Sequence, residues 1–330
     1  MSTATRWLLS AGLLLFIGVL ASQGLPTVLS MLALAGFGLV LVALYHVLPL
    51  ALDAAAIRVL FAKPACGTMR DALLARWVGE SAGSLMPAGQ IGGPVLMARH
   101  LALRGLALED AAAAVIVGTT LQTFAQVGFA LMGVALLGAH ATHASRDAVR
   151  ATALIASGFL GLQIVGFYLM QRRGLFRKLM RAAAWLLGKR DWSEWMSHAD
   201  AIDAAVERTY RRGGAAALSF ALNSVGWLVG TVEVYWILYL IGFPVSWMDA
   251  LLLESIGQAI RGAAFAVPGA LGVQEGGYVL LASLVGLPSH TGLALSLGKR
   301  TREILLGLPG LLYLHLSERA GANAVRAASR

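Results

Sequence analysis

The chain has 330 residues, of which 58% are hydrophobic and only 13% are charged, and its mean hydropathy is +0.73. A soluble domain of this size needs far more surface charge, so the composition excludes an ordinary soluble enzyme and favours one membrane domain over the whole chain. The net charge of +9 comes from basic residues between apolar blocks. This placement indicates topology determinants and contacts with anionic lipid headgroups rather than with nucleic acid.

Metal and redox chemistry have little support in the sequence. Cys66 is the only cysteine, which excludes an internal disulfide and a cysteine metal cluster. His140 and His143 are close together in a short polar loop, but a metal site needs three or four ligands. We therefore expect neither a metal nor a cofactor.

Six apolar blocks are each about long enough to cross a hydrocarbon core of roughly 30 Å as a helix. They cover residues 7–22, 27–50, 110–138, 151–170, 215–241 and 291–316. The first block follows Arg6 and ends in small residues, a pattern that it shares with cleavable signal peptides. Because another apolar block follows at once, we expect a retained helix. The prediction is an all-α polytopic membrane protein.

A long polar segment, residues 171–214, separates the fourth and fifth blocks. It carries ten basic residues against five acidic ones, with apolar residues and tryptophans at roughly helical spacing. This pattern predicts an amphipathic helix on the inner membrane surface. A small solvated helical hairpin is the alternative.

The distribution of lysine and arginine predicts the orientation. The segments 53–76, 171–214 and 317–330 are rich in both, whereas the links 22–26, 242–249 and 286–290 contain neither. All basic segments lie on one side if each of the two remaining regions enters and leaves the membrane on the same face. The distribution therefore predicts that both termini lie in the cytoplasm.

Those two regions, residues 72–106 and 250–285, are apolar but interrupted in the same way. In each, a charged residue (Glu80 or Arg261) is followed seven positions later by a proline (Pro87 or Pro268) and then by glycines. We expect the helices to break at Pro87, Gly89, Pro268, Gly269 and Gly272. Broken helices entering from opposite faces are typical of inverted-repeat transporters, so we predict two re-entrant hairpins. A pair of kinked ordinary helices is the alternative.

The last apolar block is interrupted by Lys299, Arg300, Arg302 and Glu303. About 12 residues precede these charges and about 13 follow, so neither flank crosses a membrane alone. Intramembrane charges are costly unless they pair or face a cavity. Two interpretations remain open: a polar path for a headgroup, and a structural ion-pair network with Glu254 or Glu275.

Other polar residues in the apolar blocks and broken regions extend the candidate path. Arg76 and Glu80 are four residues apart and form a candidate ion pair. Arginine donors suit a phosphate or hydroxyl-rich headgroup. The residues that we expect along the path are Glu80, Gly92, Gly93, Arg99, Asn223, Glu233, Glu254, Arg261, Glu275, Lys299, Arg300, Arg302 and Glu303.

Three segments carry a resemblance to a known family: GESAGSLMPAGQIGGPVLMAR (79–99), AIRGAAFAVPGALGVQEGG (259–277) and GKRTREILLGLPGLL (298–312). The chain resembles the transmembrane region of bacterial lysylphosphatidylglycerol synthases, a flippase-like family. Within it, the chain is most similar to stand-alone hopanoid-biosynthesis-associated membrane proteins. The resemblance implies a lipid-flippase-like fold with inverted halves. It also marks Pro87, Gly92, Gly93, Arg261, Pro268 and Glu275 as important.

Three functions follow as hypotheses. The first is translocation or trafficking of a hopanoid, glycolipid or phospholipid. The second is an intramembrane lipid-modifying enzyme, for which the sequence contains no catalytic motif. The resemblance places the family's aminoacyl-transferase activity in an added soluble domain, and because the chain ends at Arg330, shortly after its last predicted span, we expect that activity to be absent. The third is a scaffold for lipid-biosynthesis enzymes. Expected partners are membrane lipids, with a second copy of the chain and those enzymes as further hypotheses.

Overall fold

In the computed structural model, eleven α-helices are described, and every regular element of the described chain is helical. The structure describes residues 17–18, 25–62, 67–86, 89–140, 158, 161–162, 165–175, 177–178, 193–264 and 267–328. The α-helices are α2 (Leu25–Ala35), α3 (Gly38–Tyr45), α4 (Val47–Arg58), α5 (Met69–Leu85), α6 (Gly89–Leu103), α7 (Leu108–His140), α10 (Ser193–Arg211), α11 (Gly213–Leu240), α12 (Trp247–Ala263), α13 (Val273–Leu284) and α14 (Ser289–Ala328), and a 3₁₀ turn, η1, covers Pro268–Ala270. The all-α prediction is confirmed for this part of the chain.

Three helical stretches among the described residues are long and apolar enough to cross a membrane: Gly38–Arg58, Leu108–Leu137 and Gly213–Leu240. The second and third confirm the predicted spans 110–138 and 215–241. Both are apolar around most of their circumference, as expected for helices surrounded by lipid and protein.

The span predicted at 27–50 lies further along the chain than expected. Gly36 has a φ of +47°, which ends α2 and separates it from α3. The spanning stretch therefore begins at Gly38 and continues to Arg58. Asp53 thereby falls inside a membrane helix, where Arg76 of α5 compensates its charge at 2.8 Å.

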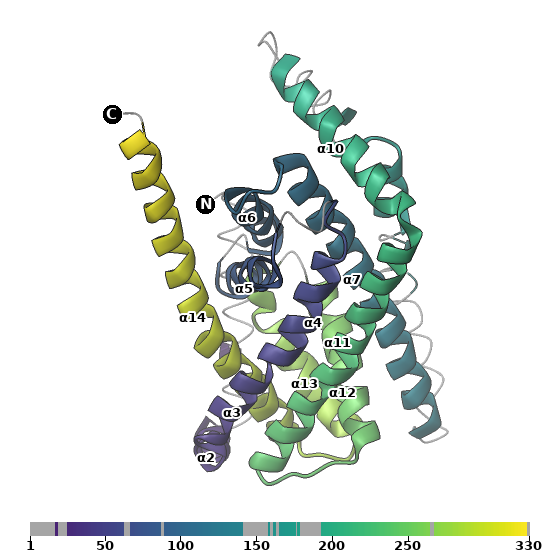
Figure 1. The fold of residues 1–330 in the computed structure, drawn as a ribbon. Helices are drawn as coiled ribbons and strands as arrows, with labels where there is room; N and C mark the ends of the chain where they lie inside the picture. Colours follow the sequence, from purple (N-terminus) through teal and green to yellow (C-terminus); the bar gives the residue numbers. More distant parts are fainter. Residues whose placement is uncertain are drawn as a thin grey trace.

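The remaining predicted spans have different outcomes. Residues 7–22 and most of 151–170 lie outside the described residues, so the count of six stays a prediction. The span at 291–316 lies within α14, a continuous helix of 40 residues. The charges that α14 carries distinguish it from the three apolar stretches, and its C-terminal part extends away from the bundle (Figure 1).

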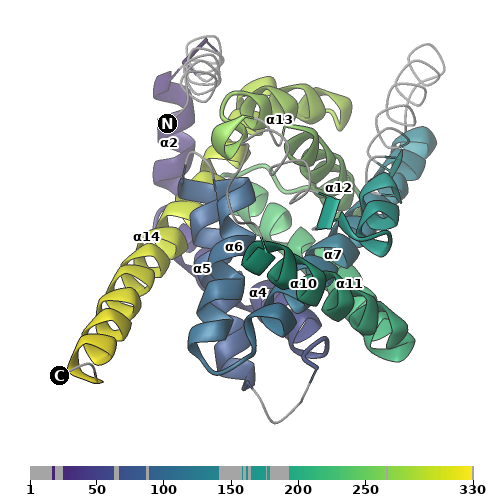
Figure 2. The ribbon, with the colours of Figure 1, turned by 90° about the horizontal axis from the view of Figure 1, so that it is seen from above.

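Both interrupted regions form helical hairpins. Helices α5 and α6 pack side by side, as do α12 and α13, which excludes one kinked helix in either place (Figure 2). The connection in the second hairpin includes η1 and the left-handed residues Gly269, Ala270 and Gly272. In the first hairpin the break lies between Leu85 and Gly89, and Pro87 falls outside the described residues.

The two hairpins lie toward opposite ends of the bundle in Figure 1 and meet at their tips, where η1 contacts both α5 and α6. Two apolar cores support them. One lies among α4 to α7 and α10, and the other lies among α2, α3 and α11 to α14. The polar residues considered below lie where these two groups of helices face each other.

The predicted surface segment 171–214 is described only in part, mainly as α10. Ala205 and Val206 of α10 are buried in the first apolar core, and the helix packs on α7. Arg177 pairs with Asp200 on its exposed side. Its position relative to the membrane surface stays a prediction.

The contact between α5 and α6 depends on glycine. A Cβ on Gly93 would lie 2.6 Å from the backbone oxygen of Gly79, whereas a Cβ on Gly92 would meet no atom within 4 Å. We expect Gly93→Ala to lower the free energy of unfolding by about 1–3 kcal/mol, because the backbone has to move. We expect Gly92→Ala to be neutral or stabilising by up to about 1 kcal/mol, because alanine favours helix. Thermal unfolding of both variants in detergent measures this, and equal midpoints would contradict it.

Candidate functional site

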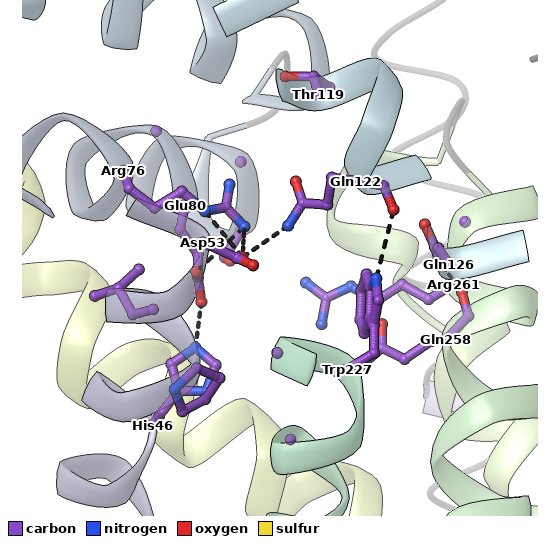
Figure 3. A pocket seen from close by; sticks show the side chains of 18 of the residues that line it. His46, Asp53, Arg76, Glu80, Thr119, Gln122, Gln126, Trp227, Gln258 and Arg261 are labelled. Atoms are coloured by element: carbon purple, nitrogen blue, oxygen red, sulfur yellow. Dashed lines mark hydrogen bonds and ion pairs between the residues drawn. The ribbon is translucent and has the colours of Figure 1, made fainter. Parts of the chain in front are cut away.

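A cavity of about 300 Å³ lies between the two groups of helices (Figure 3). Its wall is formed by α4, α5, α6, α7, α11, α12 and α14. The charged and amide side chains that line it are His46, Asp53, Arg76, Glu80, Gln122, Gln126, Glu233, Glu254, Gln258, Arg261 and Arg302. Such a concentration of polar groups inside an apolar bundle marks a functional-site candidate.

One wall of the cavity is built around Asp53. Arg76 donates to its carboxylate from Nη2 at 2.8 Å and from Nε at 3.2 Å, and Gln122 donates from Nε2 at 2.7 Å. Gly226 leaves room for this group, since a Cβ there would lie 3.2 Å from Asp53 Oδ1. Arg76 also lies 3.8 Å from Glu80, the pair predicted from their spacing.

His46 joins this wall to the rest of the bundle. It is the single residue between α3 and α4, and its ring lies 2.7 Å from Glu80 of α5 and 2.5 Å from Glu233 of α11. Arg302 of α14 lies 3.1 Å from the other oxygen of Glu233 and also approaches the imidazole. Four elements therefore meet at one ionisable group.

The charges of α14 are distributed among its neighbours. Lys299 pairs with Glu254 of α12 at 2.5 Å, and Arg300 pairs with Glu275 of α13 at 3.0 Å. Glu303 accepts from Arg261 of α12 and from Arg300 at 3.2 Å. The ion-pair network anticipated with Glu254 and Glu275 is therefore present.

Not every member of this network faces the cavity. Lys299 is 1% exposed and is absent from the cavity wall, and Glu275 is fully buried and also accepts from the backbone N–H of Gly272 at the start of α13. The charges of Lys299 and Glu275 are therefore compensated by partners within the protein. Arg300 instead borders a second pocket of about 230 Å³, mostly apolar, between the tips of the two hairpins.

Arg76 and Arg261 approach the cavity from opposite walls (Figure 3). Arg76 is held by Asp53, and Arg261 is held by Glu303. Gln126 of α7 and Gln258 of α12 lie beside Arg261, and Gln126 donates to the backbone oxygen of Gln258 at 2.8 Å. The two guanidinium groups with neighbouring amides form a surface that suits phosphate or hydroxyl oxygens.

In the ion-pair network around the cavity, the numbers of positive and negative charges are equal only when His46 is counted as a cation. The carboxylates are Asp53, Glu80, Glu233, Glu254, Glu275 and Glu303, and the permanent cations are Arg76, Arg261, Lys299, Arg300 and Arg302. Buried charges are tolerated when each has an opposite partner. The imidazolium form of His46 supplies the sixth cation.

The structure brings most of the predicted path residues together. Glu80, Glu233, Glu254, Arg261 and Arg302 line the cavity. Glu275, Lys299, Arg300 and Glu303 join them through ion pairs.

Other predicted residues lie elsewhere. Arg99 has a side chain that is 62% exposed and pairs with Glu318. Asn223 is buried and donates to Ser219 in its own helix, and Gly93 serves the contact between α5 and α6. Gly89 is the first residue of α6, and Gly269 and Gly272 form the break in the second hairpin.

Several cavity residues were not predicted from the sequence, above all His46, Asp53, Gln122, Gln126 and Gln258. His46 and Asp53 are ionisable residues in an otherwise apolar stretch, which is the signal that identified Lys299 and its neighbours. Gln122 and Gln126 are four residues apart in an apolar span, so they share a helix face. These patterns were present in the sequence.

A substitution at Glu303 tests whether the ion-pair network stabilises the fold. Glu303→Gln leaves Arg261 without its buried carboxylate, so we expect unfolding to become easier by about 3–5 kcal/mol. The matched control is Glu318→Gln, which removes an exposed pair and is expected to cost less than about 1 kcal/mol. Thermal unfolding in detergent compares them. A Glu303→Gln midpoint as high as that of the control would show that the network does not hold the bundle together.

Comparison with known proteins gives one match. The family model described as the lysylphosphatidylglycerol synthase TM region matches residues 4–310. No curated protein and no solved structure matches the chain. The matched range contains both hairpins, the cavity and the charged part of α14, and it covers well over half of the 330 residues. The chain therefore belongs to the family of the lysylphosphatidylglycerol synthase transmembrane region.

Proposed function

We propose that the protein moves an amphiphilic lipid across or within the bacterial cytoplasmic membrane, with the headgroup in the cavity and the apolar part in the surrounding lipid. Family membership and the apolar helices establish the coarser statement, a membrane protein with a lipid-related function. We further propose that it acts as a carrier without covalent chemistry. The substrate classes that we propose are hopanoid, glycolipid and phospholipid.

The observation that carries the proposal is the pair of arginines facing one cavity. Arg76 and Arg261 come from different hairpins, α5–α6 and α12–α13, and both line the same space. A phosphate between them would receive charge-assisted hydrogen bonds from two directions. Thr119, Thr123, Gln122 and Gln126 of α7 add neutral groups that suit headgroup hydroxyls.

The hairpin arrangement supports alternating access. In inverted-repeat transporters, binding sites lie near the bilayer midplane between broken helices, and one repeat moves against the other. Here the hairpins approach from opposite ends and their tips contact each other beside the cavity. We propose that they are re-entrant, that the α5–α6 hairpin enters from the cytoplasm, and that both termini lie on that side.

The test is lipid movement in proteoliposomes that contain a fluorescent phosphatidylglycerol. We expect wild-type protein to speed the exchange of the probe between leaflets. Arg261→Gln is expected to slow it about tenfold to a hundredfold, because one charge-assisted hydrogen bond contributes about 1.5–3 kcal/mol. Arg99→Gln is the matched control, since this arginine is exposed outside the cavity, and its rate should equal that of wild type.

Two further results decide the interpretation. Arg261→Lys keeps a cation beside Glu303, so it separates loss of folding from loss of headgroup contact. A well-folded wild-type protein that moves neither phosphatidylglycerol nor a glycolipid probe faster than empty liposomes would overturn the proposal. Equal rates for wild type and Arg261→Gln would show that the cavity is not where the headgroup binds.

A further inference from the structure

His46 has an unusual set of partners for a histidine in an apolar span. Its Nδ1 lies 2.5 Å from Glu233 Oε1, and its Nε2 lies 2.7 Å from Glu80 Oε1. A neutral imidazole has a single N–H and can serve only one of these carboxylates, whereas an imidazolium donates to both. The two glutamates therefore stabilise the protonated ring.

The same site also contains a hydrogen-bond donor for the neutral form of the His46 ring. Arg302 Nη1 lies 2.5 Å from Nδ1 and 3.1 Å from Nε2, and arginine only donates. A ring nitrogen that has lost its proton therefore has a donor beside it. Each nitrogen faces both an acceptor and a donor, so either protonation state finds hydrogen-bond partners.

The charged groups around His46 come from every element packed against it: Glu80 from α5, Glu233 from α11 and Arg302 from α14, with Asp53 further along α4. The glutamates differ in their access to the cavity. The side chain of Glu80 is 27% exposed, whereas that of Glu233 is 2% exposed. Of the two carboxylates that face the ring, Glu80 is therefore the more accessible from the cavity.

We propose that His46 is a proton-binding site that couples lipid movement to proton transfer through Glu80. The coupling rests on the proposed function, whereas the proton site stands on its own geometry. On release, the Nε2–H bond breaks, its electron pair stays on nitrogen, and the proton forms an O–H bond on Glu80 and then passes to water in the cavity. The lone pair on Nε2 then accepts from Arg302.

This transfer changes how the α5–α6 hairpin is held. With the ring protonated, Glu80 is tied by an ion pair to the α3–α4 junction and through it to Glu233 of α11. Once the proton is lost, that ion pair disappears and the six carboxylates of the network outnumber its five remaining cations. Proton release therefore contributes to transport by weakening the contact that holds the α5–α6 hairpin to the α3–α4 junction.

The proton site is tested without transport. Protein with ¹⁵N-labelled histidine in lipid nanodiscs is followed by NMR from about pH 5 to 9, the range in which histidine titrates. We expect one titrating imidazole that is missing from His46→Gln and retained in His290→Gln. Glu80→Gln should move its midpoint to lower pH by about one unit, because one of the two carboxylates facing the ring is neutralised. An imidazole at His46 that keeps one protonation state throughout, in wild type and Glu80→Gln alike, overturns the proton site.

The coupling is tested with a pH gradient across proteoliposomes that contain the fluorescent phosphatidylglycerol. We expect the wild-type rate to change about tenfold per pH unit, because occupancy of a single proton site changes by that factor above its pKa. In His46→Gln and Glu80→Gln the rate should be independent of the gradient. If the wild-type protein moves the lipid at a rate that does not depend on the pH gradient, the coupling is overturned but the proposed function is not. Absence of any movement overturns both, and the titration still decides the proton site.

Discussion

The fold depends on the need to neutralise the charges that α14 carries where it packs against the other helices. Lys299, Arg300, Arg302 and Glu303 lie within five residues of α14 and point in different directions, because each residue turns the helix by about 100°. Their partners therefore come from different helices: Glu254 and Arg261 from α12, Glu275 from α13 and Glu233 from α11. Removing one partner would leave a buried charge uncompensated, which costs far more than an exposed ion pair gains. The positions of α11, α12 and α13 around α14 are constrained accordingly.

The hairpins are a consequence of the same requirement. Backbone that leaves the helical conformation needs protein or water around it at membrane depth. The turn at Gly269 and Gly272 is supported by protein, since Glu275 accepts from the N–H of Gly272 and the tip contacts α5 and α6. Because Glu275 also binds Arg300, the charge network and the broken backbone stabilise each other.

Much of this arrangement could be predicted from local sequence. The hairpin breaks follow from Pro and Gly spacing, the spans 110–138 and 215–241 follow from length and hydropathy, and the pair Arg76–Glu80 follows from helical spacing.

The partners of residues that lie far apart in the sequence could not be assigned. Glu303 lies four residues from Lys299, yet it binds Arg261, which is 42 residues away. His46 could have been singled out as an ionisable residue in an apolar stretch, but its partners could not, because Glu80 and Glu233 are 34 and 187 residues away and no local pattern links them to it. The start of the span at Gly38 was missed because the hydropathy of 27–50 is continuous across the break at Gly36.

The network separates into two parts with different exposure. Lys299 and Glu254 have side chains that are 2% and 4% exposed, so their pair is removed from water and fixes α12 on α14. Arg76, Glu80 and Arg261, with side chains that are 18%, 27% and 17% exposed, border the cavity, and water or a headgroup can compete for their hydrogen bonds. An ion pair that a ligand can replace is weaker than one that is fully enclosed, because water screens it. The enclosed pair therefore supplies a rigid anchor, and the cavity-facing pairs supply the contacts that can exchange partners. The proposed carriage of a headgroup and the proposed release of a proton both require this combination, since the helices must keep their positions while the cavity wall exchanges its hydrogen bonds.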